Sequence, residues 1–197
     1  PGKLWWVIGA AGVLAAFFIM AFYTEVASWV LTYVGKAITG EILTTNAETN
    51  SAIFGSLVSN PVVSLVMQWV ALAIMGVIIA LGVTKGIERV TKRLLPALLI
   101  LLVIVAIRSL TLSGVGEGLA FLFKPDFSKI TWAVILTAVG LAFFKLSIGM
   151  GAMLTYGSYY GEKQNIPGTA LRVMLGDLAI SMIAGIAIFP AVFTYGF

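Results

Sequence analysis

Five long apolar stretches constrain the fold of this chain more than any other feature of its sequence. They run approximately over residues 4–34, 62–83, 94–112, 132–159 and 169–195. Each is long enough for a helix that crosses a bilayer, which requires about 20 apolar residues. The stretches do not alternate between apolar and polar residues, as the strands of a membrane β-barrel do. We therefore expect an all-α membrane protein, a helical bundle with five spans in one transmembrane domain.

The composition narrows the chemistry that such a bundle can perform. The chain is 60% hydrophobic and 10% charged, and it contains no cysteine and no histidine. These absences exclude disulfides, thiol catalysis and imidazole-based metal or proton chemistry within the chain. Asp177 is the one aspartate in an apolar stretch, so paired-aspartate or metal catalysis lacks a second group. We expect no enzyme activity and no organic cofactor.

The distribution of positive charge predicts the orientation. Loop 84–93 carries four lysine and arginine residues, which is typical of cytoplasmic loops. The loops at 36–60 and 113–129 then lie outside a plasma (inner) membrane. The net charge of +4 arises in such loops and does not suggest nucleic-acid binding. The chain starts at Pro1 and stops after an apolar run, so we expect an internal piece of a longer membrane protein.

Lys145 lies near the middle of the fourth stretch, where a charge is costly unless another group compensates it. Asp177, at similar depth in the fifth stretch, is the expected partner. Glu25 is a further charge in an apolar stretch, without an assigned role. The glycines that follow Lys145 predict a discontinuous helix around residues 145–151, whose backbone groups could bind a ligand. The alternative is that the small residues of 147–151 only allow close helix packing.

The run at 142–159, AFFKLSIGMGAMLTYGSY, resembles the sixth transmembrane helix of the neurotransmitter:sodium symporter family, especially its bacterial amino-acid transporters. Shorter runs resemble other parts of that family in the same order: FYTEVASW (22–29) in helix three, KGIER (85–89) between helices four and five, FKPDF (123–127) before helix six, and AGIAIFP (184–190) in helix seven. The resemblance implies helices three to seven of a leucine-transporter-like inverted-repeat fold.

The resemblance also implies roles for single residues. Tyr23 matches the tyrosine whose hydroxyl donates a hydrogen bond to the substrate carboxylate. Phe144 matches the aromatic lid over the substrate, and Tyr159 matches the tyrosine of the cytoplasmic gate. The positions that line the substrate side chain correspond to Ile19, Phe144, Ser147 and Met150. Such a pocket would suit a neutral hydrophobic amino acid.

Three further positions match the ion sites of the family, and two of them depart from its pattern. Lys145 stands where the family carries a threonine or serine that helps to bind the first sodium ion. Asp177 replaces an asparagine that ligates the same ion, and Ser181 matches the chloride-site serine. A charged ammonium has no lone pair for sodium and would repel it. Our hypothesis is that the Lys145 ammonium replaces this sodium and pairs with Asp177.

Two other interpretations of Lys145 stay open. The pair with Asp177 could be a static lock between two helices, which need not stabilise strongly because desolvation offsets the Coulomb attraction. Alternatively, Lys145 could lose its proton during transport, and the transporter would then exchange or co-transport protons. Burial lowers the pKa of a lysine and a nearby carboxylate raises it, so the sequence leaves the direction of the shift open.

The function that the resemblance implies is sodium-dependent symport of an amino acid by alternating access. Sodium would be the coupling ion at least at a second site, formed by helices outside this sequence. The expected partners are the amino acid, sodium, the bilayer and the missing helices of the same transporter. The alternatives are a proton-coupled amino-acid transporter of the same fold and a non-transporting membrane subunit.

Overall fold

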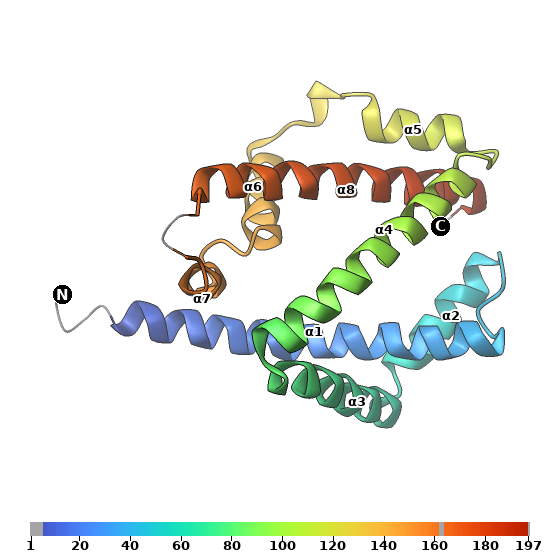
Figure 1. Cartoon of the computed structure of the whole chain (residues 1–197). Helices are drawn as coiled ribbons and strands as arrows, with labels where there is room; N and C mark the ends of the chain where they lie inside the picture. Colours follow the sequence, from blue (N-terminus) through green and yellow to red (C-terminus); the bar gives the residue numbers. More distant parts are fainter. Residues whose placement is uncertain (1–5, 162–163, 197) are drawn as a thin grey trace. The chain divides into compact units, whose positions relative to one another are not determined.

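The computed structural model describes residues 6–161 and 164–196, and every regular element in these ranges is a helix (Figure 1). Four segments are long and apolar enough to cross a membrane: Trp6–Thr39, Pro61–Ala80, Lys85–Ser109 and Ile166–Tyr195. The elements in order are α1 (Trp6–Thr39), α2 (Ala47–Val58), α3 (Pro61–Ala80), η1 (Val83–Glu88), α4 (Arg89–Ser109), α5 (Val115–Phe123), η2 (Phe127–Lys129), α6 (Trp132–Lys145), α7 (Ala152–Ser158) and α8 (Ile166–Tyr195). The expected all-α class is therefore confirmed.

Four of the predicted apolar stretches each overlap one long helix, α1, α3, α4 or α8, whereas the fourth apolar stretch does not. That stretch is divided, because α6 ends at Lys145 and α7 begins only at Ala152. The predicted discontinuity around 145–151 is therefore confirmed. The start of the first stretch, residues 4–5, lies outside the described residues. That the helices make five crossings within one transmembrane domain stays a prediction.

Several helices begin at polar residues that satisfy their first free N–H groups. Asn46 Oδ1 accepts from the Thr49 N–H at 3.1 Å, and Asn60 Oδ1 accepts from the Val63 N–H at 3.2 Å. Thr131 Oγ1 accepts from the Val134 N–H at 3.3 Å at the start of α6. Such caps fix where a helix begins because its first turn has no internal acceptors.

The packing of the chain divides it into two compact units. The first, called here the break unit, comprises residues 1–22 and 125–178, and so contains the start of α1, the interrupted helix and the start of α8. The second, called the hairpin unit, comprises residues 23–124 and 179–197.

Within the hairpin unit, the connection from α3 to α4 forms the basic loop. Gly82 has φ +81, and the π-helical turn η1 follows directly. The backbone of Gly86 is pressed against α3, since a Cβ there would lie 1.9 Å from the Ile78 carbonyl oxygen. Lys92 forms an ion pair with Glu88 at 2.6 Å. The loop that carries the positive charge is therefore a tight helical turn.

At its other end, the hairpin unit packs α5 against the last turns of α8. The Gly114 N–H donates to Thr194 Oγ1 at 2.9 Å, and this hydroxyl donates to the Pro190 carbonyl at 2.7 Å. Pro190 is fully buried, and Phe121 lies against the Phe189 ring with centroids 4.8 Å apart. The glycine-rich start of α5 allows this contact because its backbone approaches α8 directly.

Candidate functional site

The break between α6 and α7 begins with a Schellman motif, the hydrogen-bond pattern that commonly ends helices. The Ser147 N–H donates to the Phe144 carbonyl at 3.1 Å, and the Ile148 N–H donates to the Phe143 carbonyl at 2.9 Å. This motif requires a left-handed residue at the position of Ser147, whose φ is +54. Ser147 is the one non-glycine residue with positive φ in the described part of the chain.

Glycines complete the break and start the second half-helix. Gly149 and Gly151 have φ values of +83 and +74, a conformation that costs glycine little. Helical bonding resumes where the Gly151 carbonyl accepts from the N–H groups of Leu154 and Thr155, at 3.2 and 3.3 Å. The break is therefore a structured non-helical segment that comprises residues 146–151.

An ion pair joins the first half-helix to α8. Lys145 Nζ lies 2.9 Å from Asp177 Oδ2, and the two side chains are 37% and 38% exposed. Lys145 occupies the last turn of α6, where the helix dipole favours a cation. The partner that the sequence suggested for Lys145 is therefore present. An ammonium so placed neutralises the Asp177 carboxylate and offers three N–H donors, but it cannot ligate a cation.

The break unit holds most of the predicted site residues. Ser147 and Met150 lie within the break and are half-buried, as is Ile19 on α1, while Phe144 precedes Lys145 on α6. Tyr159 follows α7 and is exposed. Lys145 and Asp177 also belong to the break unit, and their ion pair brings these two predicted site residues into direct contact.

Two predicted site residues belong to the hairpin unit. Tyr23 lies on α1 one turn beyond Ile19, and Ser181 lies on α8 one turn beyond Asp177. Their participation in a site with the break stays a prediction, as do the substrate and ion roles of the other residues.

Glu25 has a partner that the sequence analysis did not identify. The Trp29 indole N–H donates to Glu25 Oε1 at 2.9 Å, one turn along α1. Beside it, Gln68 Nε2 of α3 donates to Thr24 Oγ1 at 3.1 Å. Spacing by four residues on one helix is the signal that could have predicted the Glu25–Trp29 bond.

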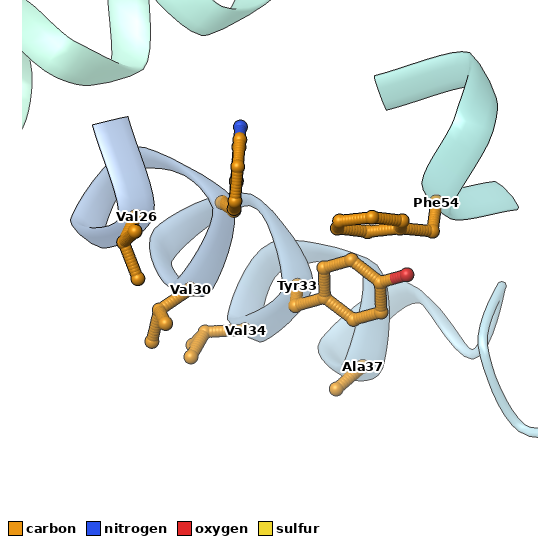
Figure 2. Close-up of a pocket in the computed structure, with 7 residues that line it drawn as sticks. Val26, Val30, Tyr33, Val34, Ala37 and Phe54 are labelled. Atoms are coloured by element: carbon orange, nitrogen blue, oxygen red, sulfur yellow. The ribbon is translucent and has the colours of Figure 1, made fainter. Parts of the chain in front are cut away.

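An apolar groove of about 460 Å³ lies on the hairpin unit, between one side of α1 and Phe54 of α2 (Figure 2). Its lining residues are Val26, Trp29, Val30, Tyr33, Val34, Ala37 and Phe54. The Trp29 and Phe54 rings meet edge to face with centroids 5.5 Å apart. None of the predicted site residues lines this groove.

Comparison with known proteins finds relatives that are named as sodium-dependent transporters. A sequence model of the Sodium:neurotransmitter symporter family matches residues 53–196. The sodium-dependent transporter YhdH of Bacillus subtilis is 41% identical over 197 residues, covering 100% of this chain and 44% of the relative. A sodium-dependent transporter of Haemophilus influenzae is 37% identical over 198 residues, covering 98% of this chain and 43% of the relative.

A mammalian protein is similar over a shorter range. The sodium-dependent neutral amino acid transporter B(0)AT3 of Mus musculus is 36% identical over 115 residues, which cover 55% of this chain and 18% of that protein. No solved structure matches the chain. The names of the relatives agree with the expectation of a transporter rather than an enzyme.

These similarities have three consequences. The chain spans less than half the length of the bacterial relatives that it matches. The described residues include four apolar helices of membrane-spanning length, and the chain forms part of a multi-pass membrane protein. Because the family model matches most of the chain, and a bacterial relative matches all of it, the chain belongs to the sodium:neurotransmitter symporter family.

Proposed function

We propose that the protein carrying this chain is a secondary transporter that couples uptake of a neutral amino acid to sodium by alternating access. The family and the names of the bacterial relatives support sodium coupling. The name of the mouse relative supports a neutral amino acid. The interrupted helix supports a solute site at the break, since opened helices place free backbone groups within a membrane. We assign the protein to the plasma membrane, with loop 84–93 on the cytoplasmic side.

The substrate would bind along the break and the facing part of α1. Its side chain would contact apolar groups, for which Ile19, Phe144 and Met150 are suited, with the Ser147 hydroxyl as a polar contact. Tyr23 would donate to the substrate carboxylate, and Tyr159 would belong to the cytoplasmic gate. The half-burial of Ile19, Ser147 and Met150 supports this proposal, because a pocket needs side chains that are partly covered yet still reachable.

The observation that carries the ion-site part of the proposal is the ion pair between Lys145 and Asp177 at the end of α6. Two unit charges 4 Å apart interact with about 4 kcal/mol at an effective dielectric constant of 20. A sodium ion next to the Lys145 ammonium would meet repulsion of this order. We infer that the ammonium occupies the place of one sodium ion and that sodium coupling uses a different site.

Uptake by the native protein in proteoliposomes, with sodium and proton gradients imposed separately, tests this function. We expect uptake of neutral amino acids that requires the sodium gradient. Uptake driven by the proton gradient without sodium would instead support the proton-coupled alternative, in which Lys145 exchanges its proton. The absence of uptake in either gradient, from protein that is folded, would support a non-transporting subunit.

Substitutions then test the replacement of sodium. Lys145→Thr and Asp177→Asn should each impair uptake, and the double variant should recover it with about one more sodium ion in the coupling ratio. The exposed pair of Lys129 and Asp126, at 3.3 Å, offers a matched control. Lys129→Thr and Asp126→Asn should leave sodium dependence unchanged. If both single variants at Lys145 and Asp177 behave like the parent, the replacement hypothesis is wrong.

A further inference from the structure

The backbone of α1 passes the break at contact distance. A Cβ atom added to Gly12 would lie 3.4 Å from Gly151 Cα, 3.7 Å from Gly151 N and 3.8 Å from the Met150 carbonyl oxygen. Conversely, a Cβ atom on Gly151 would lie 3.3 Å from Gly12 Cα. Both glycines belong to the break unit and are half-buried. The backbone of α1 at Gly12 and the backbone of the break at Gly151 are therefore in direct contact.

This contact falls on the residue where the helix resumes. Gly151 caps α7 in the left-handed conformation, and its carbonyl accepts the first two hydrogen bonds of α7. Any displacement of Gly151 therefore moves the start of α7 and the residue before it, Met150. At the opposite end of the break, Lys145 is held to α8 by Asp177. The break is attached to the rest of its unit at both ends, through two different contacts.

We propose that Gly12 is a positioning residue for the break. Its lack of a side chain lets α1 hold the start of α7 in place. The ion pair holds the end of α6, and together the two attachments set the course of residues 146–150. The expected effect of Gly12 on substrate binding rests on the proposed function, because Ser147 and Met150 would line the substrate site. The effect on the backbone does not rest on it.

The distances predict a graded response to substitution at Gly12. A single methyl group at 3.4 Å is at the limit of ordinary van der Waals contact, so Gly12→Ala should change little. The two additional methyl groups of Gly12→Val must displace Gly151, since backbone atoms cannot turn aside as a flexible side chain can. Gly9 lies on the same helix with nothing within 4 Å of its Cβ position. Gly9→Val therefore changes the helix propensity of α1 as much as Gly12→Val does, but it introduces no contact with the break.

Hydrogen–deuterium exchange of the native protein in nanodiscs tests the backbone effect. In Gly12→Val, the amides of Leu154 and Thr155 should exchange about tenfold faster, because their acceptor on Gly151 moves. In the same variant, the exchange rates of the Ser147 and Ile148 amides should rise less. In Lys145→Thr, by contrast, exchange should rise more at Ser147 and Ile148 than at Leu154 and Thr155. If Gly12→Val gives insufficient folded protein, Gly12→Ala should show the same pattern at smaller amplitude. Exchange that is unchanged, or that also rises in Gly9→Val, would overturn the proposal.

Uptake provides the second measurement. Gly12→Val should raise KM about tenfold with a smaller change in kcat, because a displaced Met150 weakens substrate contacts before it slows the conformational cycle. Gly12→Ala should stay within about threefold of the parent. Equal losses in kcat for Gly12→Val and Gly9→Val would indicate a general folding defect and contradict a positioning role. If the parent transports nothing, the proposed function fails, while the exchange pattern still decides the role of Gly12.

Discussion

Lys145 and Asp177 join α6 to α8 at the residue where helical hydrogen bonding stops, with Nζ and Oδ2 2.9 Å apart. Each side chain keeps a little over a third of its exposure. The pair is therefore intermediate between fully exposed and fully buried ion pairs. Exposed pairs contribute about 0–1 kcal/mol to stability. Breaking a fully buried pair costs about 3–5 kcal/mol, mainly through the charge left behind.

We therefore predict that Lys145→Thr or Asp177→Asn alone lowers the free energy of unfolding by about 1–3 kcal/mol. The double variant should lose less than the sum of the two, with a coupling energy of about 0.5–3 kcal/mol. Pulse proteolysis of the protein in detergent measures the three values. The Lys129–Asp126 pair, whose side chains are 83% and 49% exposed, should show little coupling. Additive effects at Lys145 and Asp177 would mean that the pair contributes nothing as a pair.

The features that the sequence predicted correctly depend on local chemistry. Apolar runs of sufficient length form helices. A lysine and an aspartate that are isolated in such runs form an ion pair, because an unpaired charge in an apolar environment is costly. The glycines after Lys145 indicated the break for a similar reason, since helices rarely continue through left-handed residues. The apolar runs, the isolated charges and the glycines can all be recognised in the sequence without knowledge of the fold.

Other features arise only from packing between distant segments. Gly12 and Gly9 are equivalent in the sequence, and the approach of Gly151 distinguishes them. The helix α2 (Ala47–Val58) lies within residues 36–60, which were expected only as an external loop. The left-handed residue that ends α6 is Ser147 rather than one of the neighbouring glycines, and no propensity rule predicts that choice.

The conformation of Ser147 leads to a prediction of its own. A left-handed backbone costs a non-glycine residue about 1–2 kcal/mol, and glycine avoids most of this cost. Ser147→Gly should therefore stabilise the protein by about 0.5–1 kcal/mol, after the greater freedom of glycine in the unfolded chain is subtracted. Thermal unfolding measures the change, with Gly149→Ala as the opposite case, since Gly149 has φ +83 and alanine there should destabilise. A Ser147→Gly variant that unfolds more readily than the parent would show that its hydroxyl contributes more than the strain costs.

Gly118 predicts a stability effect at the contact between α5 and α8. A Cβ atom there would lie 2.5 Å from Pro190 N and 2.7 Å from Pro190 Cα, and neither backbone atom can yield. Gly118→Ala should cost about 1–3 kcal/mol. Gly116 lies in the same short helix with nothing within 4 Å of its Cβ position, so Gly116→Ala should be neutral or stabilise by up to about 1 kcal/mol. Thermal unfolding compares the two variants, and equal effects would contradict the close approach of α5 to α8.

The charged pair after α1 predicts a dependence on pH. Lys36 Nζ lies 2.9 Å from Glu41 Oε2, and its hydrogen bond and positive charge lower the pKa of Glu41 below the ordinary 4.5. Because this pKa is lowered, the stabilisation is present above pH 4.5 and is lost as the pH falls through the lowered value. Asp126 also has a lowered pKa, but the Ser128 hydroxyl is the largest cause and Lys129 comes second.

The two carboxylates should therefore respond differently when the neighbouring lysine is removed. Lys36→Met should move the pKa of Glu41 most of the way back to its ordinary value, because the hydrogen bond and the charge of Lys36 are the two largest causes of the lowering. Lys129→Met should return the pKa of Asp126 only in part, because the Ser128 hydroxyl still donates to the carboxylate. NMR titration of ¹³C-labelled side-chain carboxyls measures both, and added salt should raise the pKa of Glu41 in the parent by screening Lys36. A Glu41 pKa that stays low in Lys36→Met would mean that another group, and not this lysine, holds the carboxylate charged.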